Sequence, residues 1–268
     1  MKLSQTIRYA LYALVLTLFA CDEVDEGKRY IFVPPVDVQR NIVIEDFTGQ
    51  RCVNCPTATV EIEKLQQEYG EEHVIAVSIH SGPFGHRTTM TSPRLSLCTE
   101  TGDRYYQYWG IEAQPGVLIN RNGNPVYDPA QYGIAVREAL SKPTSLQLNV
   151  GTTLSEDGTT LAVEIEALTG EAMDGKLQVW LLEDNIVDIQ LMPDGTTNRA
   201  YQHNHVLRMS LTHDYLGDSF PVSNKEAQTL NYTANIDGQW NSNNLSVVAF
   251  YFTEQEGVVQ AVRRRVVK

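Results

Sequence analysis

The first part of the chain alternates apolar runs with a stretch of helical periodicity. Residues 41–47 and 73–79 are rich in Ile and Val and alternate little, as strands buried on both faces do. Between them, residues 57–69 carry apolar side chains at helical spacing, and Gly70 would end that helix. The order strand, helix, strand predicts two parallel strands joined by a right-handed crossover.

A second group of elements follows a polar interruption. Residues 80–100 are rich in Gly, Pro, Ser and Thr and predict a long loop or insertion, followed by a helix over 99–109. Residues 115–127 predict a strand, an Asn-Gly turn and a returning antiparallel strand. A helix over 130–140 then closes this part of the chain.

Beyond residue 142 the pattern changes to short alternating segments separated by turn signals. The segments are 146–150, 161–165, 177–181, 247–251 and 258–262. Short alternating strands of this kind predict an antiparallel β-sandwich. The sequence therefore predicts an α/β domain over 40–142, with an insertion at about 80–109, followed by an all-β sandwich domain over 143–268.

The N-terminus has the pattern of a targeting segment. Lys2 and Arg8 precede an apolar run, residues 9–20, that is too short to span a bilayer. The run ends in Leu-Phe-Ala before Cys21, which resembles a bacterial lipoprotein signal peptide (1–20) whose Cys is lipidated. The alternatives are an ordinary secretory signal that happens to contain a Cys, or an internal helix.

The segment from Cys21 to residue 39 reads as a linker. It begins with four acidic residues, Asp22, Glu23, Asp25 and Glu26. They resemble the export tags of surface lipoproteins in Bacteroidetes-type bacteria, and they also suit a solvated tether. The two interpretations are compatible.

Composition narrows the classes of partner. The 268 residues are 42% hydrophobic and 20% charged, which is enough for one large or two ordinary cores. The formal net charge is -12, which does not favour nucleic acid or anionic headgroups as partners.

Cysteines carry the candidate chemistry. Cys52 and Cys55 stand two residues apart at the predicted start of a helix, where unpaired N–H groups favour a thiolate. With Cys98 left over, an exported chain of this kind suggests a redox pair and a free or resolving thiol, although a lone Cys is more often a small buried hydrophobe. Zinc is disfavoured because no second CxxC and no suitably spaced His follows.

Residues around this pair resemble the thioredoxin fold over about 40–141. Asp46 precedes Cys52 at the spacing seen in thioredoxins, where that Asp is a buried proton acceptor. Gln114–Pro115 stands where thioredoxins carry a cis-proline that faces the dithiol. The chain departs from the pattern with Arg51 in place of Trp and with Gln114 in place of Thr, Val or Ile.

This resemblance implies roles for individual residues. Cys52 would be the exposed nucleophile and Cys55 the resolving thiol, with Asp46 shuttling its proton. Arg51 would further favour the thiolate, and Pro115 would hold a backbone edge for an extended peptide.

Two further residues would lie near the pair, and one alternative stays open. His80 follows the second strand and, with Gln114, would line a cleft beside the dithiol, although its position in a polar loop favours a solvated histidine. The alternative is a permanently closed structural disulfide. Neither interpretation requires a cofactor.

Other polar and aromatic residues could form a functional site or could simply pack in the core. His203 and His205 are two apart, so on one strand they would face the same side, and with His213 and Asp214 they suggest a metal site. Leu207 and Met209 continue that face and favour half-buried histidines instead. An aromatic cluster suggests either a peptide-binding rim or packing against the sheet. It comprises Tyr105, Tyr106, Tyr108 and Trp109.

The whole pattern is similar to the 28-kilodalton outer-membrane lipoproteins of Bacteroidetes-type bacteria, on the runs 45–56 and 201–208. This similarity implies an outer-membrane protein anchored by lipid at Cys21, on the periplasmic or the surface face. Two functions stay open. One is a thiol–disulfide oxidoreductase acting on the thiols or disulfides of exported proteins. The other is a surface binding or adhesion lipoprotein, with a partner protein and a purely structural disulfide.

Overall fold

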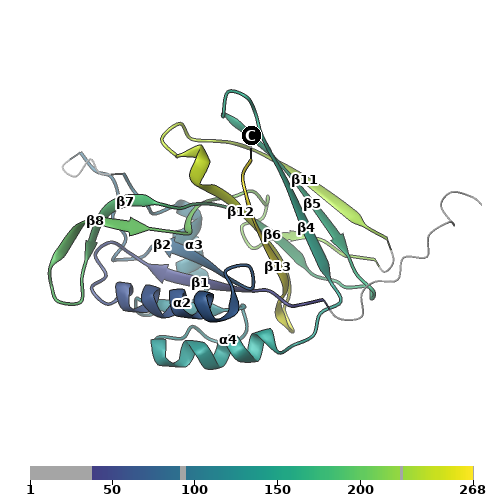
Figure 1. Ribbon diagram of the computed structural model, residues 1–268, viewed down its shortest axis with the longest axis horizontal. Coiled ribbons are helices and arrows are strands. Elements are labelled where there is room, and N and C mark those ends of the chain that lie inside the picture. Colours follow the sequence, from purple (N-terminus) through teal and green to yellow (C-terminus); the bar gives the residue numbers. More distant parts are fainter. Residues whose placement is uncertain (1–37, 91–94, 224–225, 268) are drawn as a thin grey trace, which may run out of the picture. The chain divides into compact units, whose positions relative to one another are not determined.

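The computed structural model describes residues 38–90, 95–223 and 226–267. The predicted signal peptide and Cys21 lie outside these ranges, so the lipid anchor stays a prediction. The described residues belong to one compact unit that extends from residue 34 to residue 268. Most of its elements are strands and few are helices (Figure 1), which confirms the prediction of a β-rich domain.

The predicted strand–helix–strand unit is present. β1 (Ile42–Thr48) and β2 (Val74–His80) pair in parallel, residue for residue over their whole length. α2 (Cys55–Tyr69) connects them, with Pro56 in the first turn, where its missing N–H leaves no bond unmade. Gly70 ends the helix with a φ of 95° and donates its N–H to the Gln66 carbonyl.

The elements that follow keep the predicted order. α3 (Glu100–Tyr108) precedes β3 (Gly116–Ile119), which pairs antiparallel with β1. The predicted returning strand contracts to a single bridge between Val117 and Val126. α4 (Tyr132–Leu140) closes this part of the chain.

The second half consists of strands and one short 3-10 helix. Its strands are β4 (Gln147–Leu154), β5 (Thr160–Leu168), β6 (Lys176–Glu183), β7 (Ile186–Leu191), β8 (Thr197–His203), β9 (Val206–Ser210), β10 (Asp218–Ser219), β11 (Gln228–Asn235), β12 (Leu245–Thr253) and β13 (Gly257–Arg265). The 3-10 helices are η3 (Pro129–Gln131), before α4, and η4 (Ser242–Asn244).

One sheet runs through both halves of the chain. It has eight strands in the order β13-β12-β6-β9-β2-β1-β3, with β10 paired to β6. The halves join where Ser78 in β2 pairs with Val206 in β9, and the Ser78 N–H donates to the His205 carbonyl at 2.8 Å. The boundary predicted near residue 143 stays a prediction, and this sheet crosses it. A three-stranded sheet, β11-β5-β4, and the two-stranded hairpin β7-β8 complete the structure.

Strand alternation distributes the apolar side chains into three clusters. One face of β1, β2 and β3 packs against α2 and α4 through residues such as Ile44 and Val136. The other face of β1 and β2 packs against α3 through Phe47 and Tyr105. A third cluster fills the space between the three-stranded sheet and strands β6, β12 and β13. Helices thus cover both faces of the sheet at one end, and a second sheet covers it at the other (Figure 1).

An ion pair lies inside the second of these clusters. Arg121 Nε donates to Glu45 Oε1 at 2.6 Å, and the two side chains are 2% and 1% exposed. Asn120 and Arg121 have φ values of 59° and 49°, so the turn after β3 directs the arginine inward through a backbone conformation that L-residues rarely adopt. The pair binds the end of β3 to the centre of β1.

Candidate functional site

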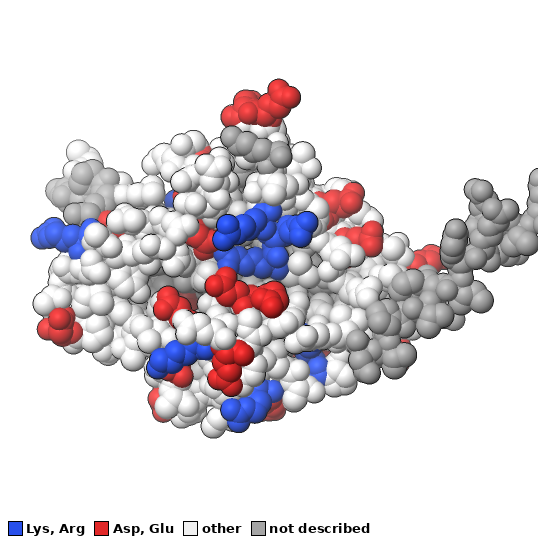
Figure 2. Space-filling view, viewed as in Figure 1, with Lys and Arg blue, Asp and Glu red and all other residues white. Residues whose placement is uncertain are grey.

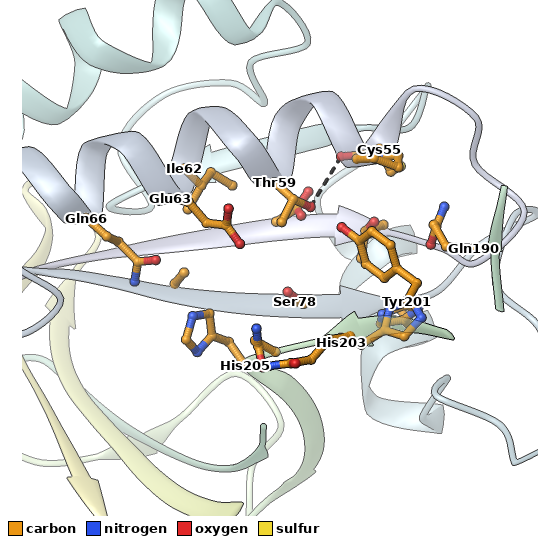
Figure 3. Close-up of a pocket in the computed structure, with 17 residues that line it drawn as sticks. Cys55, Thr59, Ile62, Glu63, Gln66, Ser78, Gln190, Tyr201, His203 and His205 are labelled. Atoms are coloured by element: carbon orange, nitrogen blue, oxygen red, sulfur yellow. Dashed lines mark hydrogen bonds between the residues drawn. The ribbon is translucent and has the colours of Figure 1, made fainter. Parts of the chain in front are cut away.

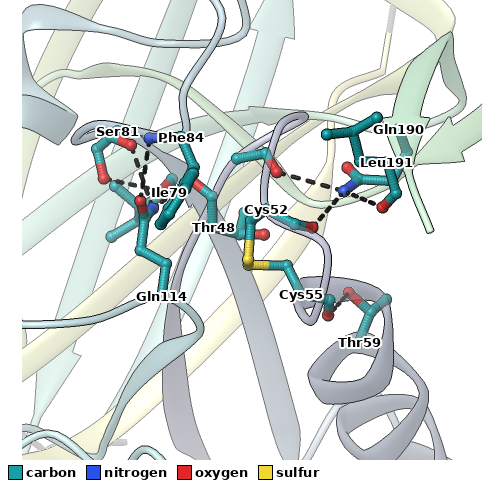
Figure 4. Close-up of a disulfide and its surroundings, with 11 residues drawn as sticks. Thr48, Cys52, Cys55, Thr59, Ile79, Ser81, Phe84, Gln114, Gln190 and Leu191 are labelled. Atoms are coloured by element: carbon teal, nitrogen blue, oxygen red, sulfur yellow. Dashed lines mark hydrogen bonds between the residues drawn. A yellow bond between two sulfur atoms is a disulfide. The ribbon is translucent and has the colours of Figure 1, made fainter. Parts of the chain in front are cut away.

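The predicted cysteine pair forms a disulfide at the start of α2 (Figure 4). Cys52 Sγ and Cys55 Sγ are 2.06 Å apart, and the two Cα atoms are 5.4 Å apart. Cys52 is 2% exposed and Cys55 is 1% exposed. The prediction of an exposed Cys52 is therefore wrong for this structure, because two segments pack over the loop that carries it.

The β7-β8 hairpin covers one side of this loop. Gln190 Nε2 donates to the Cys52 carbonyl at 2.9 Å and lies 3.3 Å from the Gly49 carbonyl (Figure 4). The Leu191 N–H donates to the Gln50 carbonyl at 2.9 Å. These bonds come from a hairpin about 140 residues further along the chain. No local sequence pattern therefore predicts them.

The segment after β2 covers the other side. The Arg51 N–H donates to the Phe84 carbonyl at 3.0 Å, and Arg51 Nη2 donates to the Gly85 carbonyl at 2.7 Å. The approach is so close that a Cβ on Gly49 would lie 2.4 Å from the Phe84 carbonyl carbon. The Arg51 guanidinium, predicted to favour the thiolate, is thus bonded to loop carbonyls.

A cis peptide joins Gln114 to Pro115 at the entrance to β3, as the resemblance to thioredoxins implies. Gln114 Nε2 donates to the Thr48 carbonyl at 2.8 Å and to the Ser81 carbonyl at 3.1 Å. Gln114 is 8% exposed. It therefore ties the ends of β1 and β2 to the start of β3 rather than lining an open cleft.

Asp46 is a buried carboxyl on β1. The side chain is 3% exposed, and among the described residues its Oδ1 has no hydrogen-bond partner. Burial raises its pKa to about 7, because the ionised form loses its hydration. A carboxyl in this state is partly protonated near neutral pH and can give or take a proton there.

Asp46 and Cys55 line the same small polar pocket. Figure 3 shows this pocket with Cys55 at its edge. Its volume is about 30 Å³, which is room for a water molecule or two. Asp46 and Ser78 are register partners on β1 and β2, so strand alternation directs both side chains under α2. The wall opposite α2 consists of Gln190, Tyr201 and His203 from the hairpin.

Two buried histidines meet at one end of this pocket. The rings of His80 and His203 are 5.1 Å apart, and His203 Nε2 lies 3.2 Å from the Ile189 carbonyl. Burial lowers the pKa of His203 to about 4 and places the pKa of His80 well below its ordinary value. The positive charge of Arg208 contributes to the second shift. His80 is thus a buried, neutral ring that lines the same pocket as Cys55, and not a solvated loop histidine.

The pocket adjoins a larger polar groove on the surface. The groove has a volume of about 550 Å³ and shares Glu63, Gln202 and His205 with the pocket. Arg263 and Arg265 line one side, and Glu63 in α2 with Glu71 and Glu72 just after it line the other. Figure 2 shows these opposite charges facing each other across the middle of the molecule.

The comparisons with known proteins place the chain in a family. The family Outer membrane protein Omp28 matches residues 102–268. The chain belongs to the Omp28 family. The outer-membrane localisation predicted from the sequence is thereby confirmed for this Omp28 protein. The match begins within α3, so the CxxC loop precedes it, whereas the hairpin that covers the loop lies within it.

Two solved structures are similar to the chain. HBP35 of Porphyromonas gingivalis is 19% identical, with 85% of this chain and 76% of that chain covered at a TM-score of 0.65, which shows a shared fold. A domain of the outer membrane lipoprotein Omp28 from Porphyromonas gingivalis is 22% identical. The alignment covers 44% of this chain and 87% of that domain's chain, with a TM-score of 0.32. No curated protein matches the chain.

The suggested histidine metal site of this Omp28 protein does not form. β8 ends at His203, and His205 has a φ of 58° before β9 begins, so the two rings do not share one strand face. The His205 backbone N–H instead donates to Asp184 Oδ1 at 2.8 Å, and the ring Nδ1 lies 3.0 Å from the same oxygen. Over residues 38–90, 95–223 and 226–267, no group of three or more His, Cys, Asp or Glu could hold a metal ion.

The remaining candidates are explained by packing. Cys98 is half-buried, and burial raises its pKa to about 11, so its thiol is poorly ionised. Tyr105 is fully buried and accepts a hydrogen bond from Trp180 Nε1 at 3.1 Å. Only Tyr108 of the aromatic cluster is largely exposed. In the described part of the chain, no helix is long and apolar enough to cross a membrane.

Acid is expected to weaken this Omp28 protein through His203. The unfolded chain binds a proton on this ring below about pH 6.5, whereas the folded protein keeps it neutral until about pH 4. Stability linked to His203 is therefore lost as the pH falls from about 6.5 to 4, by about 2–3 kcal/mol. Denaturant unfolding at both pH values should show a smaller acid loss in His203→Gln than in the wild type.

The control for this prediction is His213→Gln, because the His213 side chain is 89% exposed. It should keep the acid loss of the wild type. An equal acid loss in His203→Gln and in the wild type would show that His203 is protonated in the folded protein.

Proposed function

We propose that this Omp28-family protein is a thiol–disulfide oxidoreductase that acts on exported proteins. Residues 40–142 would form its thioredoxin-like part, and lipid on Cys21 would anchor it in the outer membrane. One observation carries the proposal: the Cys52–Cys55 disulfide at the start of α2 shares a small polar pocket with Asp46, a carboxyl whose pKa is about 7. Perturbed groups beside a reactive pair are typical of working sites.

The reaction follows from the position of each sulfur. A substrate thiolate attacks Cys52 Sγ, a mixed disulfide forms, and the bond to Cys55 Sγ breaks. A second substrate thiolate then attacks the substrate sulfur of the mixed disulfide and releases Cys52 as a thiolate. Two substrate thiols become one disulfide, and the protein gains two electrons as a dithiol. The reverse sequence reduces a substrate disulfide.

Asp46 and the helix supply the proton and charge balance. The leaving Cys55 thiolate takes a proton from the carboxyl of Asp46, directly or through water in the pocket. The N-terminus of α2 stabilises the thiolate of Cys52. In the reverse direction Asp46 accepts the proton of Cys55, so one carboxyl with a pKa of about 7 serves both directions near neutral pH.

Turnover tests this proposal. The mature protein should accelerate the reduction of insulin by dithiothreitol, and Cys52→Ser should abolish the acceleration because no mixed disulfide can form. Cys98→Ser is the matched control, since Cys98 lies outside the pocket, and it should keep the wild-type rate. A wild-type rate equal to the uncatalysed rate, or full activity in Cys52→Ser, would refute the proposal.

A second candidate function rests on the burial of Cys52. A sulfur whose residue is 2% exposed and covered on two sides suits a structural disulfide in a surface binding lipoprotein. This function predicts no turnover, together with a lower melting temperature and unchanged partner binding in a Cys52→Ala, Cys55→Ala double variant.

A further inference from the structure

The β7-β8 hairpin covers both the disulfide and the pocket that holds Asp46. We propose that this hairpin selects which thiols reach Cys52, and that Gln190 holds it closed by taking the place of a substrate peptide. The substrate class is then an extended, thiol-bearing segment of an unfolded exported protein. This inference rests on the proposed oxidoreductase function.

The hairpin is attached in a way that lets it lift. β7 and β8 pair with each other as a separate two-stranded sheet, and such hairpins are marginally stable alone. None of their residues belongs to the three apolar clusters of the described chain, and Val187 is 64% exposed. The turn between them projects beyond α2 in Figure 1. Lifting it breaks hydrogen bonds and leaves the apolar core intact, as in other low-stability elements.

The bonds at the covered loop are those that an extended peptide makes. The Leu191 N–H donates to the Gln50 carbonyl at 2.9 Å, as in a strand pair. Gln190 Nε2 donates to the Cys52 carbonyl at 2.9 Å and to the Gly49 carbonyl at 3.3 Å. Backbone N–H groups of a bound peptide strand supply such donors. A substrate segment can therefore replace the hairpin bond for bond, whereas a small thiol has few donors to offer.

A further hydrogen bond joins the hairpin to the same loop. Gln50 Nε2 donates to Asp188 Oδ2 at 2.9 Å, so the side chain of Gln50 as well as its carbonyl bonds to the hairpin. On the other side of the hairpin, Tyr201 and His203 close the pocket over Asp46. Lifting the hairpin would expose the sulfur and the carboxyl together, so a substrate meets both in one step.

The rate of reduction of the Cys52–Cys55 disulfide in the full mature protein tests this inference. Dithiothreitol and an extended peptide with two cysteines serve as single-turnover reductants, followed by alkylation and mass detection. Gln190→Ala should be reduced by dithiothreitol about five- to tenfold faster than the wild type, since hydrogen bonds of about 1 kcal/mol from Gln190 hold the β7-β8 hairpin closed. The preference for the peptide over dithiothreitol should fall accordingly.

Val187→Ala is the control, because it changes the same strand at an exposed position, and it should react as the wild type does. Equal dithiothreitol rates in Gln190→Ala and the wild type would overturn the inference. If Gln190→Ala does not fold, amide exchange of the wild type decides. Leu191 should exchange faster than residues of β1, and exchange of Leu191 only by global unfolding would overturn it.

These rates and the proposed function fail separately. If Gln190→Ala speeds reduction but the wild type does not reduce insulin, the hairpin controls access to the disulfide and the proposed oxidoreductase function is wrong. If the wild type reduces insulin but Gln190→Ala and the wild type are reduced by dithiothreitol at equal rates, the oxidoreductase function stands and the role given to the hairpin is wrong.

Discussion

Replacing Arg121 with methionine is expected to lower the free energy of unfolding by about 3–5 kcal/mol, because it leaves the Glu45 carboxylate buried without a partner. Glu45 is 1% exposed, and Arg121 Nε provides the bond at 2.6 Å. Five aromatic rings also lie within 6 Å of the guanidinium carbon: those of Tyr105, Trp109, Trp180, Phe250 and Phe252. Urea unfolding at neutral pH measures the loss.

A double variant separates the ion pair from simple packing. In Glu45→Gln, Arg121→Met neither residue of the pair is charged, so its stability should exceed that of Arg121→Met alone. Arg264→Met is a matched surface control, since Arg264 is exposed in β13, and it should change stability little. A loss of unfolding free energy below about 1 kcal/mol in Arg121→Met would show that this ion pair contributes little to the stability of the fold.

Replacing Asp46 with asparagine is expected to raise the free energy of unfolding at pH 8 by about 3–4 kcal/mol. The unfolded chain releases the proton of this carboxyl near pH 4, whereas the folded protein holds it until about pH 7. Stability linked to Asp46 is therefore full below about pH 4 and is lost as the pH rises to about 7. The amide carries no charge at any of these pH values, so the variant avoids the loss.

Denaturant unfolding at pH 4, 6 and 8 measures this difference. At pH 4 the two proteins should be alike, and the gain should grow through pH 6 to pH 8. Asp194→Asn is the control, because hydrogen bonds from Thr196 lower the pKa of that exposed carboxyl and its removal should bring no gain at pH 8. A pH-independent difference between wild type and Asp46→Asn would show that Asp46 is ionised in the folded protein.

Local patterns predicted most of the first half of the chain. The apolar runs of β1 and β2, the helical spacing of α2 and the CxxC at its start are set by nearby residues, and the structure has all of them. The place of Asp46 beside Cys55 came from the resemblance to thioredoxins, and the structure puts both in one pocket.

Long-range pairing is what the sequence did not reveal. The bridge between Ser78 and Val206 joins two halves that were predicted as separate domains, and no local pattern specifies such a partner. β8 is mostly exposed from Thr197 to Ala200 and lacks the alternation of a half-buried strand. No sequence pattern around Gln190 indicates that its side chain bonds to the CxxC loop. The burial of Cys52 under the hairpin was therefore not predicted.

The reduction potential of the Cys52–Cys55 disulfide in the mature protein tests the central claim most directly. It is measured by equilibration with glutathione and mass detection. A working oxidoreductase should give a value between about -120 and -270 mV. A value below about -300 mV would contradict the claim and identify a structural disulfide.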